Sequence, residues 1–178
     1  MNPRLAVLAK TALVTAAAFS LFSLYSKNVP YSLAWNRTPS IPMGLYLTET
    51  ITPTKLVRGD IACFEYAPPD WARQRKYFPA GVSLCKPVAG MAGDVVRHEG
   101  TKLFIKTAGD AEFKFLGDYA ATDSVKRPLP QDALPEGAIP EGSFLMIAGR
   151  HPNSLDSRYL GLVPAASLKR RIHPLYTW

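Results

Sequence analysis

The chain has 178 residues, of which 21 are Lys or Arg and 14 are Asp or Glu, so its formal charge is +7. This length suits one domain, or one domain with an added anchoring helix. A hydrophobic content of 47% excludes a wholly disordered chain, and the presence of only 2 Cys excludes a disulfide-scaffold protein. The excess positive charge lies at the two ends, because residues 38–168 contain 14 acidic and 14 basic side chains. A basic groove is therefore not expected, and nucleic acid is not a predicted partner.

Residues 5–26 form a segment of small and apolar residues without Pro or Gly, and Lys10 is its one charged residue. The uncharged part is shorter than the roughly 20 residues that span a bilayer, but a snorkelling Lys10 would lengthen it. We predict an N-terminal signal or membrane anchor over residues 1–27, with its N-terminus in the cytoplasm because positive charge precedes it. A cleaved signal peptide and a buried core helix remain alternative interpretations.

The rest of the chain is rich in Pro and Gly, and its apolar runs are short. These runs predict strands over residues 44–47, 60–64, 82–85, 94–97, 102–106 and 143–147. The polar segment 107–142 is interrupted by Pro and Gly and is a candidate inserted hairpin or loop. The predicted fold class is mainly β, with one domain over residues 28–178 that follows one N-terminal helix.

Ser40 lies between two prolines, Pro39 and Pro42. Each proline restricts its own φ angle and biases the preceding residue toward extended backbone. The Ser40 hydroxyl would therefore sit on a stiff loop, where a nucleophile is useful, although a plain Ser-Pro turn is the simpler interpretation.

Lys86 lies among apolar residues shortly before a turn with the pattern Gly90-x-x-Gly93-Asp94. Burial would lower the pKa of this lysine and allow it to accept a proton. A solvated lysine at a strand end is the alternative. A phosphate-binding loop is not favoured, because the Gly-Lys-Ser/Thr ending is missing.

Two further segments complete the pattern: Arg58-Gly59-Asp60 before an apolar run, and the stretch Asn-Ser-x-Asp-Ser-Arg-Tyr-x-Gly that begins at Asn153. Taken in order, the four segments resemble the conserved boxes of the bacterial type I signal peptidases. The form Thr-x-Ser-x-Pro-x-Gly-x-Tyr from Thr38 is most similar to the TraF subgroup, conjugal transfer signal peptidases that mature pilin for plasmid conjugation. Pro87 and Met91 depart from the general family pattern, which leaves the substrate open.

The resemblance implies an antiparallel β-sheet domain of the signal-peptidase type that works as a serine endopeptidase. Ser40 would attack the scissile carbonyl and Lys86 would take its proton. The oxyanion hole would consist of the Ser40 backbone N–H and the Thr38 hydroxyl. Ser154 would orient the Lys86 amine, with an ion pair between Asp156 and Arg158 in support.

The implied partners are a membrane-anchored prepilin or another precursor protein and the lipid bilayer, at the periplasmic face of the bacterial inner membrane. Simple trimming and coupled cyclisation of the pilin both remain open. The alternatives are a general type I signal peptidase for secreted precursors and a non-enzymatic, membrane-tethered assembly factor. No cofactor or metal is predicted, because the Cys and His residues lack ligand spacing.

The sequence leaves three details undecided. A Ser–His arrangement with His151 is an alternative to the lysine base. Cys63 and Cys85 would form a disulfide in an oxidising compartment or remain two buried thiols. Residues 169–171, which are Lys-Arg-Arg, form either a solvated tail or a contact with anionic lipid.

Overall fold

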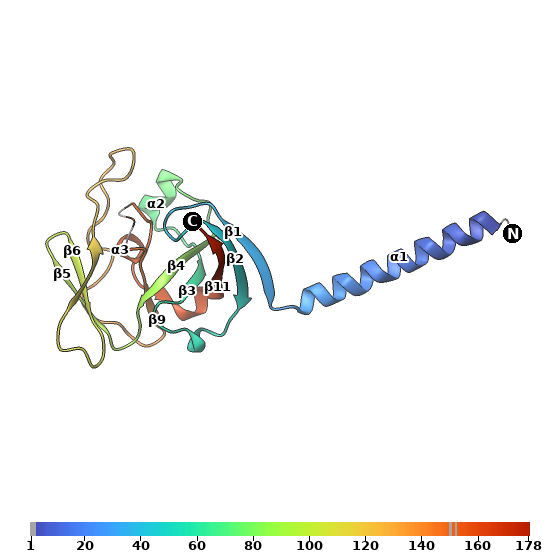
Figure 1. Cartoon of the computed structure of the whole chain (residues 1–178). Helices are drawn as coiled ribbons and strands as arrows, with labels where there is room; N and C mark the ends of the chain where they lie inside the picture. The colour runs from blue at the N-terminus through green and yellow to red at the C-terminus, as the bar shows by residue number, and fades with distance from the viewer. Residues whose placement is uncertain (1–2, 150, 152) are drawn as a thin grey trace. The chain divides into compact units, whose positions relative to one another are not determined.

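The structure is a computed structural model that describes residues 3–149, 151 and 153–178. The chain divides into two compact units, Met1–Ser32 and Leu33–Trp178. Helix α1, Pro3–Asn28, covers the breaker-free segment predicted to be helical (Figure 1). Within the described residues, no helix combines the length and the apolar character needed to cross a membrane. The N-terminal membrane anchor predicted over residues 1–27 is therefore not supported.

The larger sheet has seven strands in the order β1-β2-β11-β3-β4-β9-β10. Its strands are β1 (Tyr31–Asn36), β2 (Gly44–Thr50), β3 (Ile61–Glu65), β4 (Ser83–Gly90), β9 (Ser143–Met146), β10 (Val163–Pro164) and β11 (Leu168–Thr177). The pairings from β2 to β10 are antiparallel. The predicted mainly β, antiparallel fold is thus confirmed.

A second sheet has four strands in the order β7-β6-β5-β8. They are β5 (Val95–Glu99), β6 (Lys102–Lys106), β7 (Lys114–Asp118) and β8 (Gly137–Ala138). The short helices are η1 (Pro53–Lys55), α2 (Asp70–Arg75), α3 (Ser157–Leu160) and η2 (Ala165–Ser167). Strands β7 and β8 belong to the segment 107–142, so that segment supplies both edges of this sheet.

Buried and partly exposed residues alternate along β4, which shows which face of this strand packs in the core of the domain. Leu84, Lys86 and Val88 are buried, whereas the residues between them are partly exposed. Leu84 and Val88 belong to one apolar cluster with residues of β3, β9 and β11, such as Phe64 and Leu168. A lysine therefore occupies a position that the strand period assigns to the core.

Each of the six predicted runs overlaps an observed strand, but β11 was not predicted. It contains the basic residues 169–171 and lies in the middle of the larger sheet, between β2 and β3. Arg171 bonds the carboxylates of Glu49 at 2.8 Å and Asp60 at 3.4 Å. The expected solvated tail or lipid contact is therefore wrong for Arg171, because the strand directs it onto neighbouring acidic side chains.

Candidate active site

Ser40 lies in the loop that joins β1 to β2. The amide of Asn36, the last residue of β1, contacts the backbone on both sides of Ser40. The hydroxyl of Tyr46 in β2 donates to the Pro42 carbonyl at 2.6 Å. The loop is therefore held by side chains, in agreement with the stiffness expected from its two prolines.

Lys86 lies on β4, directly across from Ala62 of β3. Only 6% of its surface is exposed, and the side chain extends on the core face of the sheet. Burial lowers the pKa of Lys86 to about 8; the Asp156 carboxylate acts in the opposite direction, and the Arg158 cation lowers the pKa further. The lysine is thus the kind of base that the sequence pattern predicts.

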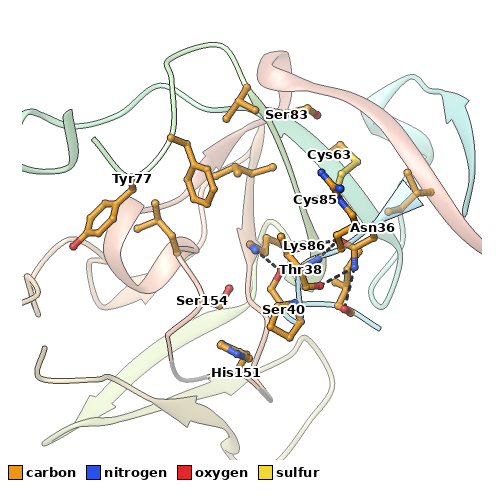
Figure 2. A pocket seen from close by; sticks show the side chains of 18 of the residues that line it. Asn36, Thr38, Ser40, Cys63, Tyr77, Ser83, Cys85, Lys86, His151 and Ser154 are labelled. Carbon is orange, nitrogen blue, oxygen red and sulfur yellow. Dashed lines mark hydrogen bonds between the residues drawn. A yellow bond between two sulfur atoms is a disulfide. The ribbon is translucent and has the colours of Figure 1, made fainter. Parts of the chain in front are cut away.

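The structure brings these two residues together across 46 positions of sequence. Lys86 Nζ donates a hydrogen bond to Ser40 Oγ at 2.8 Å (Figure 2). A neutral lysine at this distance can accept the hydroxyl proton directly, without an intervening group.

Asp156 and Arg158 form a completely buried ion pair. Arg158 Nη2 and Nε each lie 2.9 Å from an oxygen of Asp156, and both side chains have 0% exposure. Arg158 also donates to the carbonyls of Asp118 and His151, while Asp156 accepts from the Ala148 N–H at 3.0 Å and caps α3. The pair is fully hydrogen-bonded, as a buried ion pair must be to persist.

Ser154 and Thr38 both line the cleft that contains Ser40 and Lys86. The Ser154 hydroxyl is buried and, within the described residues, has no hydrogen-bond partner. The Thr38 hydroxyl donates to Asn36 Oδ1 at 2.8 Å. The side chain of His151 also lines the site, but its buried Nδ1 has no partner among the described residues. Figure 2 shows Ser154 and His151 close to the Ser40–Lys86 pair.

A cleft of about 690 Å³ opens at Ser40 and Lys86. Its apolar walls include Ile41, Tyr46, Phe78, Val82, Leu84, Leu129, Leu155 and Ile172. The cleft is large enough for several residues of an extended peptide, and its lining is typical of a binding site with few polar groups.

The boxes around Arg58 and Asp94 have a structural role near this cleft. Arg58 Nη2 bonds Asp94 Oδ2 at 2.6 Å, and Arg58 also donates to the Ala89 carbonyl. Asp94 in turn accepts from the Met91 N–H at 2.7 Å. These bonds fix the end of β4, the strand that carries Lys86.

Three features of the cleft were not predicted or were left open by the sequence. The Asn36 contacts were missed, although an Asn side chain commonly bonds the backbone two residues further along the chain, as it does here at Thr38. The disulfide between Cys63 and Cys85 joins directly opposed residues of β3 and β4. At the rim, Tyr77 and Arg127 both donate to the Asp123 carboxylate, and these residues lie in segments with no recognised motif.

A mainly β domain with a buried lysine bonded to a serine in an apolar cleft is the arrangement of a signal-peptidase-type protease. The family described as signal peptidase, peptidase S26, matches residues 5–176, so the chain belongs to this family. It is also similar to the plasmid transfer protein TraF of Escherichia coli, with 28% identity over 156 residues, which covers 80% of this chain and 82% of that protein. The expected resemblance to TraF-type signal peptidases is thereby confirmed, and a peptidase of this family acts on precursor proteins.

Proposed function

We propose that the protein is a serine endopeptidase in which Ser40 is the nucleophile and Lys86 the general base. The observation that carries this proposal is the 2.8 Å hydrogen bond from Lys86 Nζ to Ser40 Oγ. With a pKa of about 8, about a tenth of Lys86 is neutral at pH 7.

In the proposed reaction, Ser40 Oγ attacks the scissile carbonyl carbon while its proton passes to Lys86 Nζ. The resulting oxyanion accepts hydrogen bonds from the Ser40 N–H and the Thr38 hydroxyl. Lys86 then gives the proton to the leaving nitrogen, the C–N bond breaks, and an ester on Ser40 remains. A water molecule attacks this ester while Lys86 takes its proton. The bond between the ester carbon and Ser40 Oγ then breaks, Lys86 returns the proton to Ser40 Oγ, and the acid product leaves.

Ser154, Asp156 and Arg158 support the base in this proposal. The Ser154 hydroxyl has no hydrogen-bond partner among the described residues, so it is available to orient the Lys86 amine when substrate shifts it. The fixed charges of Asp156 and Arg158 act on the pKa of Lys86 in opposite directions. The ion pair as a whole therefore carries no net charge next to the base.

The proposed substrate is the precursor of a conjugative pilin, which is supported by the similarity to the plasmid transfer protein TraF. The cut would either leave a trimmed pilin or, if the pilin's own amino group replaces water in the last step, a cyclic one. We place the catalytic domain, residues 28–178, at the periplasmic face of the inner membrane. The Cys63–Cys85 disulfide supports an oxidising compartment.

The test is processing of a co-expressed prepilin by the full chain and by the variants Ser40→Ala and Lys86→Ala. We expect both variants to fold and to leave the precursor uncut. Ser83→Ala, which changes a serine of the same cleft on the same strand, is the matched control and should cleave normally. Cleavage by either dyad variant would overturn the proposed mechanism.

The same experiment separates the alternatives. A wild-type chain that cuts a generic secreted precursor but not prepilin would be a general signal peptidase, and one that cuts neither would favour an assembly factor. Mass spectrometry of the mature pilin distinguishes trimming from joining, because the cyclic product is lighter by one water.

A further inference from the structure

We infer that Asn36 is a positioning residue that holds the nucleophile loop and the Thr38 hydroxyl ready for the reaction. This inference rests on the proposed function of Ser40 and Lys86. It concerns a side chain to which the family resemblance assigns no role.

The Asn36 side chain contacts the loop through both halves of its amide. Oδ1 accepts from the Thr38 backbone N–H at 3.1 Å and from the Thr38 hydroxyl at 2.8 Å. Nδ2 lies within hydrogen-bond distance of the carbonyl oxygens of Thr38 at 2.8 Å, Ile41 at 3.2 Å and Pro42 at 3.0 Å. The bonded groups therefore precede and follow Ser40 in the chain, and Figure 2 shows Asn36 and Thr38 beside Ser40.

The chemistry of this loop explains why an amide is suited to the position. Pro39 and Pro42 have no N–H, so the loop has fewer backbone donors with which to hold itself. Asn offers an acceptor and two donors on a short stem, whereas Asp offers acceptors only. A single side chain therefore fixes carbonyls that would otherwise depend on water.

The contact with Thr38 links Asn36 to the chemical step. A threonine hydroxyl has one proton, and in this structure that proton is directed at Asn36 Oδ1. To stabilise the oxyanion, the hydroxyl must redirect its proton toward the substrate. Asn36 thus sets the resting orientation of the Thr38 donor and fixes the backbone before and after Ser40.

The experiment is a double-mutant cycle between position 36 and position 38 in the full chain, measured as kcat and KM on the cleaved precursor. Asn36→Ala removes all contacts, Asn36→Asp keeps the acceptor but loses the donors, and Thr38→Val removes the hydroxyl with little change of shape. We expect each of the three single variants to lower kcat at least tenfold with KM changed less than threefold. Asn36→Ala should lower the logarithm of kcat by a certain amount in the wild-type chain. In the chain that already carries Thr38→Val, the same substitution should lower it by less than half of that amount.

Ser167→Ala is the control, because the Ser167 hydroxyl also bonds a backbone carbonyl, that of Pro164, and neither of these residues lines the cleft. It should keep wild-type kcat. The inference would be overturned if Asn36→Ala kept full activity. It would also be overturned if the double variant lost kcat by the product of the two single-variant losses. Activity that survives in Ser40→Ala would instead overturn the proposed function, so the two failures are distinguishable.

Discussion

Lys86 Nζ lies 2.8 Å from Ser40 Oγ, although Lys86 is on β4 and Ser40 is on the loop before β2. Strand pairing creates this contact: β2 pairs with β11, β11 with β3, and β3 with β4. The chemistry of the site therefore depends on the order of the sheet as much as on the two residues themselves.

The rate of cleavage should rise with pH through a midpoint near 8, since burial lowers the pKa of Lys86 to about 8 from 10.5. Only the neutral amine accepts the Ser40 proton, so kcat/KM should increase about tenfold per pH unit below the midpoint and level off above it. A pH series from 6 to 10 measures this. A midpoint near 10.5, the ordinary value for a lysine, would contradict the role of the buried Lys86 amine.

Replacing Lys86 by Met should remove activity and stabilise the fold at neutral pH. A lysine whose pKa is lowered in the folded state is harder to protonate there than in the unfolded chain, so its cost is fully present below pH 8. The wild type should gain stability as the pH rises from 8 to 10.5. We expect Lys86→Met to be more stable by up to about 3 kcal/mol at pH 7, and much less so at pH 10.5. Urea unfolding at both pH values tests this prediction. A stability difference between the variant and the wild type that does not change with pH would contradict it.

Arg158→Met should destabilise the domain by about 3–5 kcal/mol, because it leaves the Asp156 carboxylate buried and unpaired. The double variant with Asp156→Asn should recover part of this loss.

The same substitutions should shift the pH midpoint of the cleavage rate where activity remains. Loss of the Arg158 cation should move the midpoint upward, since that cation lowers the pKa of Lys86. Asp156→Asn alone should move the midpoint downward. Thermal unfolding and pH–rate curves give the two readouts, and a shift in the opposite direction would contradict the assignment.

Opening the Cys63–Cys85 disulfide should destabilise the domain by about 3 kcal/mol, as expected for a crosslink that joins residues 22 apart. Cys63 also packs in one cluster with Ile41, the residue after Ser40. Cys63→Ala with Cys85→Ala should therefore lower both the unfolding free energy and the cleavage rate. The doubly substituted chain, measured with and without dithiothreitol, is its own control, since the reductant should affect only the wild type. Unchanged unfolding would contradict the prediction.

Local sequence was sufficient to predict much of the site. Ser40 is marked by its prolines and Lys86 by its apolar neighbours, and both belong to recognisable motifs. The strands that carry these motifs were also predictable, because their apolar runs end at turn residues. The buried state of Asp156 and Arg158 was not predictable, since it depends on contacts such as the bond from Arg158 to the Asp118 carbonyl, 40 positions away in the sequence.

Other features depend on contacts distant in sequence. Strand β11 was missed because three consecutive basic residues and Pro174 conceal its alternation. The bonds from Tyr77 and Arg127 to Asp123 join segments that have no motif. Helix α1 was predictable as a helix, because its segment combines small and apolar residues and lacks Pro and Gly between Arg4 and Asn28.

Gly44→Ala should destabilise the larger sheet, although the substitution adds only one methyl group. Gly44 has a φ of +146°, and a Cβ atom there would lie 2.0 Å from the Tyr176 carbonyl oxygen and 2.8 Å from the Thr177 Cα. Both neighbours are backbone of β11, so β2 and β11 would have to separate where Gly44 pairs with Thr177. Gly109→Ala is the matched control, because Gly109 has a φ of +93° but no atom of the described residues within 4 Å of the place that a methyl group would take. Strain in φ alone costs on the order of 1–3 kcal/mol, so Gly44→Ala should exceed Gly109→Ala in loss of unfolding free energy. Equal losses in urea unfolding would mean that the backbone angle, and not the approach of β11, requires glycine in this motif.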